Sequence, residues 1–158
     1  MGVGEYKRPF SRIIFLGDYM KNFKRYAAFF LIGGAGYALI ELLWRGRTHW
    51  TMVLAGGISF MLFSYITVIF ADNSLLLKAA LSALSVTVVE LVFGVVFNVI
   101  LGMKVWDYSN VPFNFLGQIC PRFTLMWGGL ALIFVPIAEM LNRKLGVLPS
   151  VQKESLIP

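Results

Sequence analysis

The chain has 158 residues, of which 58% are hydrophobic and only 14% are charged. Because soluble domains carry about 25% charged residues, this balance argues against a soluble protein and indicates an integral membrane protein. A single cysteine, Cys120, excludes an internal disulfide framework, and a single histidine, His49, cannot build a multi-histidine metal site. We therefore expect neither a bound metal nor a cofactor.

Residues 1–25 form a basic segment ahead of the first long apolar stretch. Its apolar residues, which include Phe10 and Met20, recur at near-helical spacing with lysines and arginines between them. This pattern predicts an N-terminal interfacial amphipathic helix whose basic residues face anionic headgroups. A short cytoplasmic helix packed on the bundle would show the same pattern, so both placements stay open.

Four stretches are long and apolar enough to cross a membrane, which takes about 20 mainly apolar residues. A cleaved signal peptide is the alternative for the first stretch, but its apolar run continues without a polar mature segment. The sequence thus predicts an all-α fold, a polytopic membrane helix bundle of about four transmembrane helices in a single integral membrane domain. The spans cover residues 26–44, 52–70, 75–101 and 123–141, and a flexible tail follows over 146–158.

Lysine and arginine are unevenly distributed over the flanks of these spans. Ten of the 14 lie on the side that carries both termini, and four lie on the other side. Because basic flanks tend to stay inside during insertion, this excess predicts that both termini are cytoplasmic. It also explains the net charge of +6 as membrane topology, so no nucleic-acid partner is expected. The connection between the third and fourth spans then lies outside.

Small residues recur within all four predicted spans. They let helices approach closely in a membrane, so they predict a tight bundle and not a chemical site. They are Gly33, Gly34, Gly36, Gly56, Gly57, Ala79, Ala83, Gly128 and Gly129.

Acidic residues inside the spans are stronger functional candidates. Each costs about 2.5–3.5 kcal/mol on insertion scales, so it normally faces the bundle interior and finds a partner. Glu90 lies near the predicted bilayer midplane, and Glu41 lies about one turn below the outer end of the first span. Gly94 and Asn98 follow Glu90 at i+4 steps and extend a polar stripe toward the outer side. The two carboxyls either contact a ligand, ion or proton, or only fix the register of neighbouring helices.

The connection between the third and fourth spans contains "VWDYSNVPFN", the densest run of polar and aromatic side chains in the chain. Trp106 and Tyr108 suit the membrane–water interface, and Asp107 can satisfy backbone N–H groups in a turn or at a helix start. Pro112 would then occupy the first turn of a short helix over "VPFNFLGQI", which Pro121 stops. We therefore predict a structured cap, or re-entrant hairpin, that contains a short helix.

The stretch "VWDYSNVPFNFLGQIC", followed by "RFTLMWG", resembles the hallmark W-D-Y-S-N-x-P-x-N-x-x-G-x-I-C of the bacterial integral membrane proteins called putative ABC-transporter type IV. Glu90 in "ELVFGVVFN" and Glu41 in "GYALIELLWRGRTHWTM" also match that family. The similarity covers about residues 27–135. It implies a multipass protein of the bacterial plasma membrane with an ABC-transporter permease-like role. Because four spans are few for an independent transporter, we also expect a homo-oligomer or a partner membrane or ATPase subunit.

The leading functional hypothesis is a transporter, or an ABC-transporter-associated membrane subunit, that binds a small polar or cationic ligand in an outer-half cavity. A structural or regulatory subunit without a ligand is the alternative, and an intramembrane enzyme that uses Glu90 or Asp107 as acid or base is a third. Phosphate-binding, metalloprotease and serine-hydrolase motifs are lacking, so we expect no enzyme. The candidate ligand-binding residues are Glu41, Glu90, Asn98, Trp106, Asp107, Tyr108, Asn110, Asn114 and Gln118.

Overall fold

The computed structural model describes residues 10–148, with side chains from residue 22 onward. Its elements are four α-helices and one π-helical turn: α1 (Phe10–Arg45), α2 (Trp50–Ile69), α3 (Leu75–Phe93), η1 (Gly94–Ile100) and α4 (Pro121–Lys144). Four helical segments are long and apolar enough to span a membrane, and α3 and η1 together form the third. The predicted all-α membrane bundle is therefore confirmed, and its helices contact the lipid bilayer.

Local sequence signals set the helix boundaries. Gly46 adopts a positive φ of 70° directly after α1, a conformation that ends helices and that glycine adopts without strain. The His49 ring accepts a hydrogen bond from the Thr51 backbone N–H at the start of α2, and the Ser74 hydroxyl caps α3 in the same way. Pro121 occupies the first position of α4, where no N–H is needed. Short turns with these local signals therefore connect α1 to α2 and α2 to α3.

The first helix continues beyond its predicted span. It begins at Phe10 and runs without a break to Arg45, so the predicted N-terminal helix and the first span form one element. The side chains of residues 10–21 lie outside the described residues, and the interfacial placement stays a prediction. At the other terminus, the Val147 N–H bonds to the Asn142 carbonyl and Leu148 is buried, whereas residues 149–158 of the predicted flexible tail are not described.

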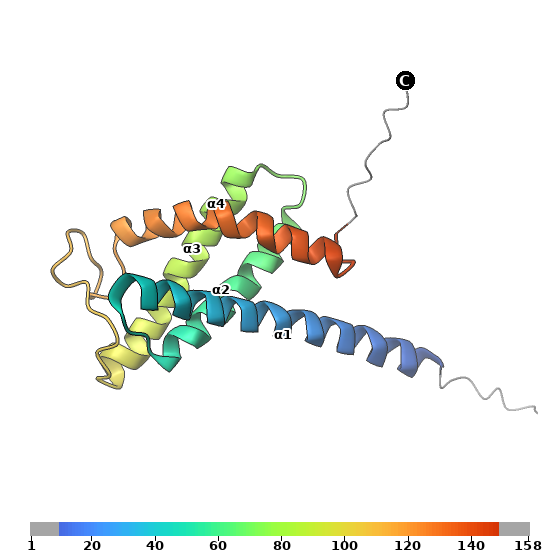
Figure 1. The fold of residues 1–158 in the computed structure, drawn as a ribbon, viewed down its shortest axis with the longest axis horizontal. Coiled ribbons are helices and arrows are strands. Elements are labelled where there is room, and N and C mark those ends of the chain that lie inside the picture. The colour runs from blue at the N-terminus through green and yellow to red at the C-terminus, as the bar shows by residue number, and fades with distance from the viewer. Residues whose placement is uncertain (1–9, 149–158) are drawn as a thin grey trace, which may run out of the picture.

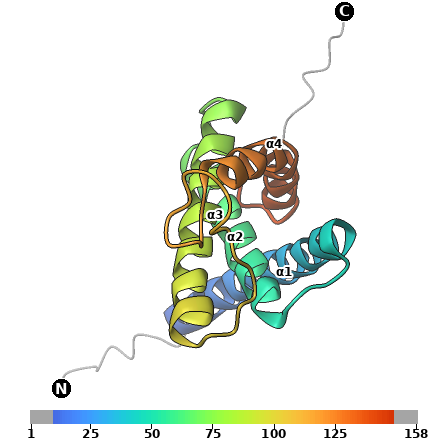
Figure 2. The ribbon, with the colours of Figure 1, turned by 90° about the vertical axis from the view of Figure 1, so that its left-hand side faces the viewer.

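The four spans form two layers. In Figure 1, α1 and α4 run along the front of the molecule, with α2 and α3 behind them, and the quarter-turn view separates the layers (Figure 2). The central helix is α2, which packs against α1, α3 and α4, whereas the backbones of α1 and α4 stay apart. A gap between the two front helices is thus backed by α2 and α3.

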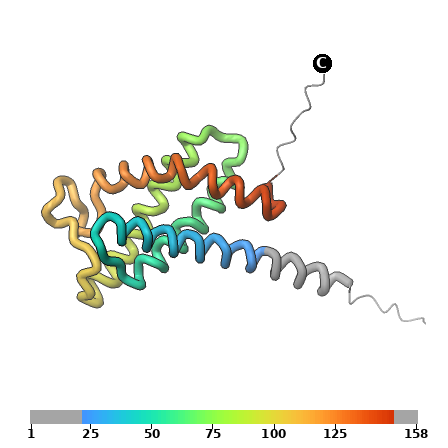
Figure 3. Tube along the Cα trace, in the orientation of Figure 1, coloured from blue at the N-terminus to red at the C-terminus, as the bar shows by residue number. Residues whose placement is uncertain are grey.

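Both described ends of the chain lie at one end of the bundle, which we call the terminal end. The Cα trace shows the connection over residues 101–120 folded back at the opposite end, which we call the loop end (Figure 3). Four consecutive spans place α1 and α4 in opposite directions, so the end of α1 and the start of α4 both lie at the loop end. This arrangement brings Glu41 close to the 101–120 connection.

Close helix contacts occur where the sequence places glycine. A Cβ atom added at Gly33 would collide with the Gly56 carbonyl of α2, and one added at Gly57 would collide with the Phe30 ring of α1. The prediction that these small residues let helices approach is therefore confirmed for the α1–α2 interface. Gly36 and Gly129 differ, because a Cβ atom at either position meets no atom within 4 Å. Gly36 instead borders open space between α1 and α4.

Buried polar contacts join the helices at the terminal end. The Lys78 ammonium of α3 lies 2.6 Å from the Glu139 carboxylate of α4 and also donates to the Ala71 carbonyl. The Asn142 amide, which has no exposed surface, donates to the Ser64 carbonyl and to the Thr67 hydroxyl of α2. These contacts satisfy polar groups that would be costly in hydrocarbon.

Candidate functional site

The connection over residues 101–120 is folded, but it does not contain the predicted short helix. Phe113, Leu116 and Gly117 have positive φ values of 59°, 54° and 66°, which no right-handed helix accommodates. The chain turns back on itself instead, and Phe115 pairs with Ile119 in an isolated antiparallel bridge. The prediction of a helix over "VPFNFLGQI" is therefore wrong, because left-handed residues interrupt it three times. We call the segment 101–120 the cap.

The side chain of Asn98 anchors the cap to η1. Its amide nitrogen donates to the Trp106 carbonyl at 2.9 Å and to the Gln118 side-chain carbonyl at 2.8 Å, and its oxygen accepts from the Val105 N–H at 2.6 Å. Gln118 in turn packs against Gly94, where any Cβ atom would collide with it. The predicted polar stripe beyond Glu90, which consists of Gly94 and Asn98, therefore holds the cap in place.

Local hydrogen bonds shape the rest of the cap. The Asp107 carboxylate accepts from the hydroxyl and the backbone N–H of Ser109, and these bonds lower the pKa of Asp107. The Asn114 amide donates to the Ser109 and Val111 carbonyls and accepts from the Gly117 N–H. Both side chains act as turn-forming residues at the surface.

The end of α1 is tied to the cap by an arginine. The Arg45 guanidinium forms an ion pair with Glu41 at 2.5 Å and donates to the Val105 carbonyl at 3.0 Å. The second oxygen of Glu41 accepts from the Thr48 hydroxyl at 2.7 Å. The charge of Glu41 is therefore balanced, and both of its oxygens have partners.

A cavity of about 160 Å³ lies at the loop end, between α1, α4 and the cap. We call it the loop-end cavity. Six of its twelve lining residues are aromatic, and Glu41 and Arg45 supply its charged groups. Tyr108 reaches it from the cap and stacks on Phe123 with ring centroids 4.3 Å apart. The lining residues are Tyr37, Ile40, Glu41, Trp44, Arg45, Met52, Trp106, Tyr108, Phe123, Met126, Trp127 and Leu130.

Glu90 lies behind the wall of this cavity. Only 2% of its surface is exposed, and its carboxyl interacts with the side chains of Tyr37, Tyr108 and Trp127, all of which line the cavity. For Trp127 this is an approach without hydrogen-bonding geometry, since its indole N–H has no acceptor among the described residues. Burial and the nearby Glu90 carboxyl raise the pKa of the Tyr108 hydroxyl. The ion pairs among the described residues do not include Glu90.

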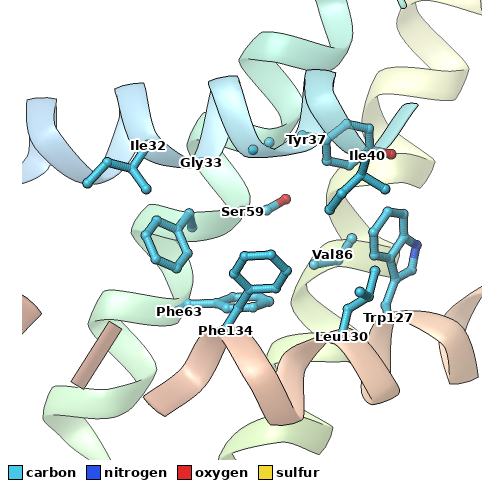
Figure 4. Close-up of a pocket in the computed structure, with 13 residues that line it drawn as sticks. Ile32, Gly33, Tyr37, Ile40, Ser59, Phe63, Val86, Trp127, Leu130 and Phe134 are labelled. Carbon is cyan, nitrogen blue, oxygen red and sulfur yellow. The ribbon is translucent and has the colours of Figure 1, made fainter. Parts of the chain in front are cut away.

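A second, apolar pocket of about 60 Å³ lies next to the loop-end cavity, deeper in the membrane-spanning region. We call it the apolar pocket. Figure 4 shows it between α1 and α4, with Ser59 and Phe63 of α2 and Val86 of α3 at its back. It shares Tyr37, Ile40, Trp127 and Leu130 with the loop-end cavity. The two spaces therefore follow each other along the gap between the front helices.

Comparison with known protein families identifies the chain. The family described as "Putative ABC-transporter type IV" matches residues 26–157, which include all four spans, the cap and both cavities. The chain belongs to this family. No curated protein and no solved structure matches it. The family predicted from the sequence is thereby confirmed, and the family's description points to a membrane protein related to ABC transporters.

The structure separates the predicted site residues of this family member into three groups. Glu41, Trp106 and Tyr108 line the loop-end cavity, and Glu90 lies directly behind it. Asn98, Asp107, Asn114 and Gln118 hydrogen-bond within the cap or to η1. Asn110 is exposed on the cap.

Several lining residues were not among the sequence candidates. Arg45 follows Glu41 at i+4, and Tyr37 precedes it at i−4, so helical spacing from the acidic residue could have found both. Trp127 belongs to the "RFTLMWG" stretch but carries no charge to mark it. Among the described residues, no three histidine, cysteine, aspartate or glutamate side chains are grouped to hold a metal ion.

Proposed function

We propose that this chain is the membrane component of a transport system and that it binds a small cationic ligand in the loop-end cavity. The observation that carries the proposal is Glu90, a buried carboxyl directly behind the cavity wall with no cationic partner among the ion pairs of the described residues. An ionisable residue within a membrane span is costly and commonly marks a ligand or ion pathway.

Charge balance around the cavity favours a cation. Arg45 neutralises Glu41, so Glu90 is the acidic group whose charge a ligand would balance. Polar side chains of Tyr37 and Tyr108 lie between this carboxyl and the cavity and can orient a ligand there. The chain offers binding groups in this cavity, and we infer that it is not an enzyme.

The distribution of basic residues supports an orientation in which both termini are cytoplasmic, in the plasma membrane of a bacterium, with the loop end outside. The ligand would then enter or leave at the outer face. Four spans are few for an independent transporter, so we infer either a homo-oligomer or assembly with a partner membrane or ATPase subunit, in keeping with the family's description.

A structural or regulatory subunit without a ligand is the second candidate, and one observation favours it. The polar atoms of Asn98 and Asn114, and both oxygens of Glu41, have partners within the protein. If Glu90 acts in the same way, its contacts with Tyr37 and Tyr108 only fix α3 against α1 and the cap.

The two candidates differ in what Glu90→Gln does to binding of choline, a small cation used here as the probe. In lipid nanodiscs, we expect the substitution to weaken choline binding by at least about tenfold, because removing one partner of a buried charge pair costs roughly 2–5 kcal/mol. Isothermal titration calorimetry measures the affinity, and thermal unfolding reports stability.

Glu139→Gln is the matched control, because it makes the same chemical change at the terminal end, in the ion pair with Lys78. It should lower stability and leave choline binding unchanged. If Glu90→Gln instead lowers stability while choline binding matches that of the unaltered protein, the chain is a structural subunit and the ligand proposal is wrong.

A further inference from the structure

The apolar pocket is open toward the side of the bundle where α1 and α4 form the front layer. The backbones of these two helices stay apart, whereas each of the two packs closely on α2 or α3 (Figure 1). In a bilayer this gap faces lipid hydrocarbon, so an apolar molecule can reach it laterally without crossing water. Ile32 and Phe134 flank the gap from opposite helices (Figure 4).

Two features of the gap distinguish it from ordinary lipid-facing surface. Gly36 lacks a side chain where a Cβ atom would meet no described atom within 4 Å, so the described side chains leave this part of the pocket open. The Ser59 hydroxyl is buried in the pocket wall, and it finds no hydrogen-bond partner among the described residues. Figure 4 shows this hydroxyl directed toward the gap. Such a buried hydroxyl is normally paired, so Ser59 marks a space inside the bundle and not ordinary lipid-facing surface.

At the loop end of the same gap, the loop-end cavity offers a different environment. The rings of Tyr37 and Trp127 meet across the gap with centroids 5.3 Å apart, at the boundary between the two spaces. Trp44, Trp106 and Tyr108 line the cavity beyond them. The faces of aromatic rings attract ammonium groups, and several rings around one space form the usual site for quaternary ammonium.

We propose that the gap between α1 and α4 binds a single-chain amphiphile with an ammonium head, the head among the aromatic rings beside Glu90 and the alkyl chain in the apolar pocket. This inference rests on the proposed function and specifies its ligand class. The lining of the apolar pocket is mainly hydrocarbon, and the loop-end cavity offers aromatic faces. The Glu90 carboxyl lies behind the wall of that cavity, with no cationic partner among the ion pairs of the described residues. An anionic head would be repelled by that carboxyl, which favours a cationic head over that of an anionic phospholipid.

Photocrosslinking in nanodiscs of zwitterionic lipid tests this assignment. The probe is dodecyltrimethylammonium with a diazirine near the end of its chain, and peptide mass spectrometry locates the attachment. We expect labelling on α1 between Ile32 and Tyr37 and on α4 between Leu130 and Phe134. An alkyl sulfate with the same chain and diazirine should label these segments far less. Equal labelling by both probes, or labelling spread over all lipid-facing helices, would overturn the proposal.

Gly36→Leu places a side chain in the pocket at a position where a Cβ atom meets no described atom within 4 Å. It should reduce specific labelling by about tenfold or more, because the alkyl chain of the probe would have to enter occupied space. Gly129→Leu is the control, since that position is equally open but lies outside both cavities. Thermal unfolding checks the fold of each variant, and Gly36→Ala provides a smaller change if Gly36→Leu is unstable.

Choline binding separates this inference from the proposed function. Gly36→Leu should leave choline affinity unchanged, because choline has no long chain to occupy the pocket. If choline binds and depends on Glu90, but neither Gly36→Leu nor Gly36→Ala reduces labelling, the amphiphile assignment alone is wrong. If neither choline nor the alkylammonium probe depends on Glu90, the proposed function fails as well.

Discussion

A membrane span can carry an amide at little cost when every hydrogen-bonding atom of that amide has a partner. Asn98 meets this condition through the Trp106 carbonyl, the Val105 N–H and the Gln118 side chain. Its position in the sequence suggested a ligand contact, but its contacts show a residue that holds the cap on η1. Glu90 differs, since it is buried two turns deeper in the third span and has no cationic partner among the described ion pairs.

Replacing Asn98 tests this difference at the residue scale. Asn98→Ala leaves the Val105 N–H and the Gln118 side chain without their partner, so we expect the free energy of unfolding to fall by about 1–3 kcal/mol. Asn110→Ala, at an exposed position of the same cap, should change it by less than about 0.5 kcal/mol. Denaturation in mixed micelles measures both. Equal effects of the two substitutions would contradict an anchoring role for Asn98.

At the scale of single elements, apolar length predicted the helices well and local turn chemistry predicted the cap poorly. The spans follow from hydropathy because each must satisfy its own backbone within the bilayer. The conformation of the cap depends on side chains that meet only after folding, such as Asn114 with the Gly117 N–H. Phe113 and Leu116 have no local preference for positive φ, and the sequence around them read as helical. The π-helical turn of η1 was not predicted either.

The contact between α2 and α4 provides a test at this scale. The Asn142 side chain forms three hydrogen bonds with Ser64 and Thr67 of α2. Because such bonds average about 0.6 kcal/mol in membrane proteins, Asn142→Ala should destabilise the bundle by about 2 kcal/mol. Thermal unfolding in detergent measures the change. Asn73→Ala, in the exposed α2–α3 turn, is the control, and a similar loss there would refute the assigned role of Asn142.

For the whole molecule, the arrangement of basic residues predicts which end faces the cytoplasm. Cys120 is the single cysteine of the chain and is buried, so Cys120→Ser gives a cysteine-free protein into which one cysteine at a time can be introduced. In intact bacteria, a thiol reagent that cannot cross membranes should label Asn110→Cys on the cap, but should label Lys144→Cys only after the membrane is permeabilised. Both positions are exposed, so accessibility does not limit the reaction. Labelling of Lys144→Cys alone in intact cells would reverse the orientation.

By itself, the sequence determined the class of protein, the four spans and the family, and it marked Glu41 and Glu90 as candidates. These depend on hydropathy, local charge and a short distinctive stretch, all of which are properties of neighbouring residues. Only the tertiary structure decided that Asn98 and Gln118 serve the cap, and that Tyr37 and Trp127 meet between two adjoining cavities. These results depend on helix packing, which brings together side chains that are far apart along the chain and carry no charge to mark them.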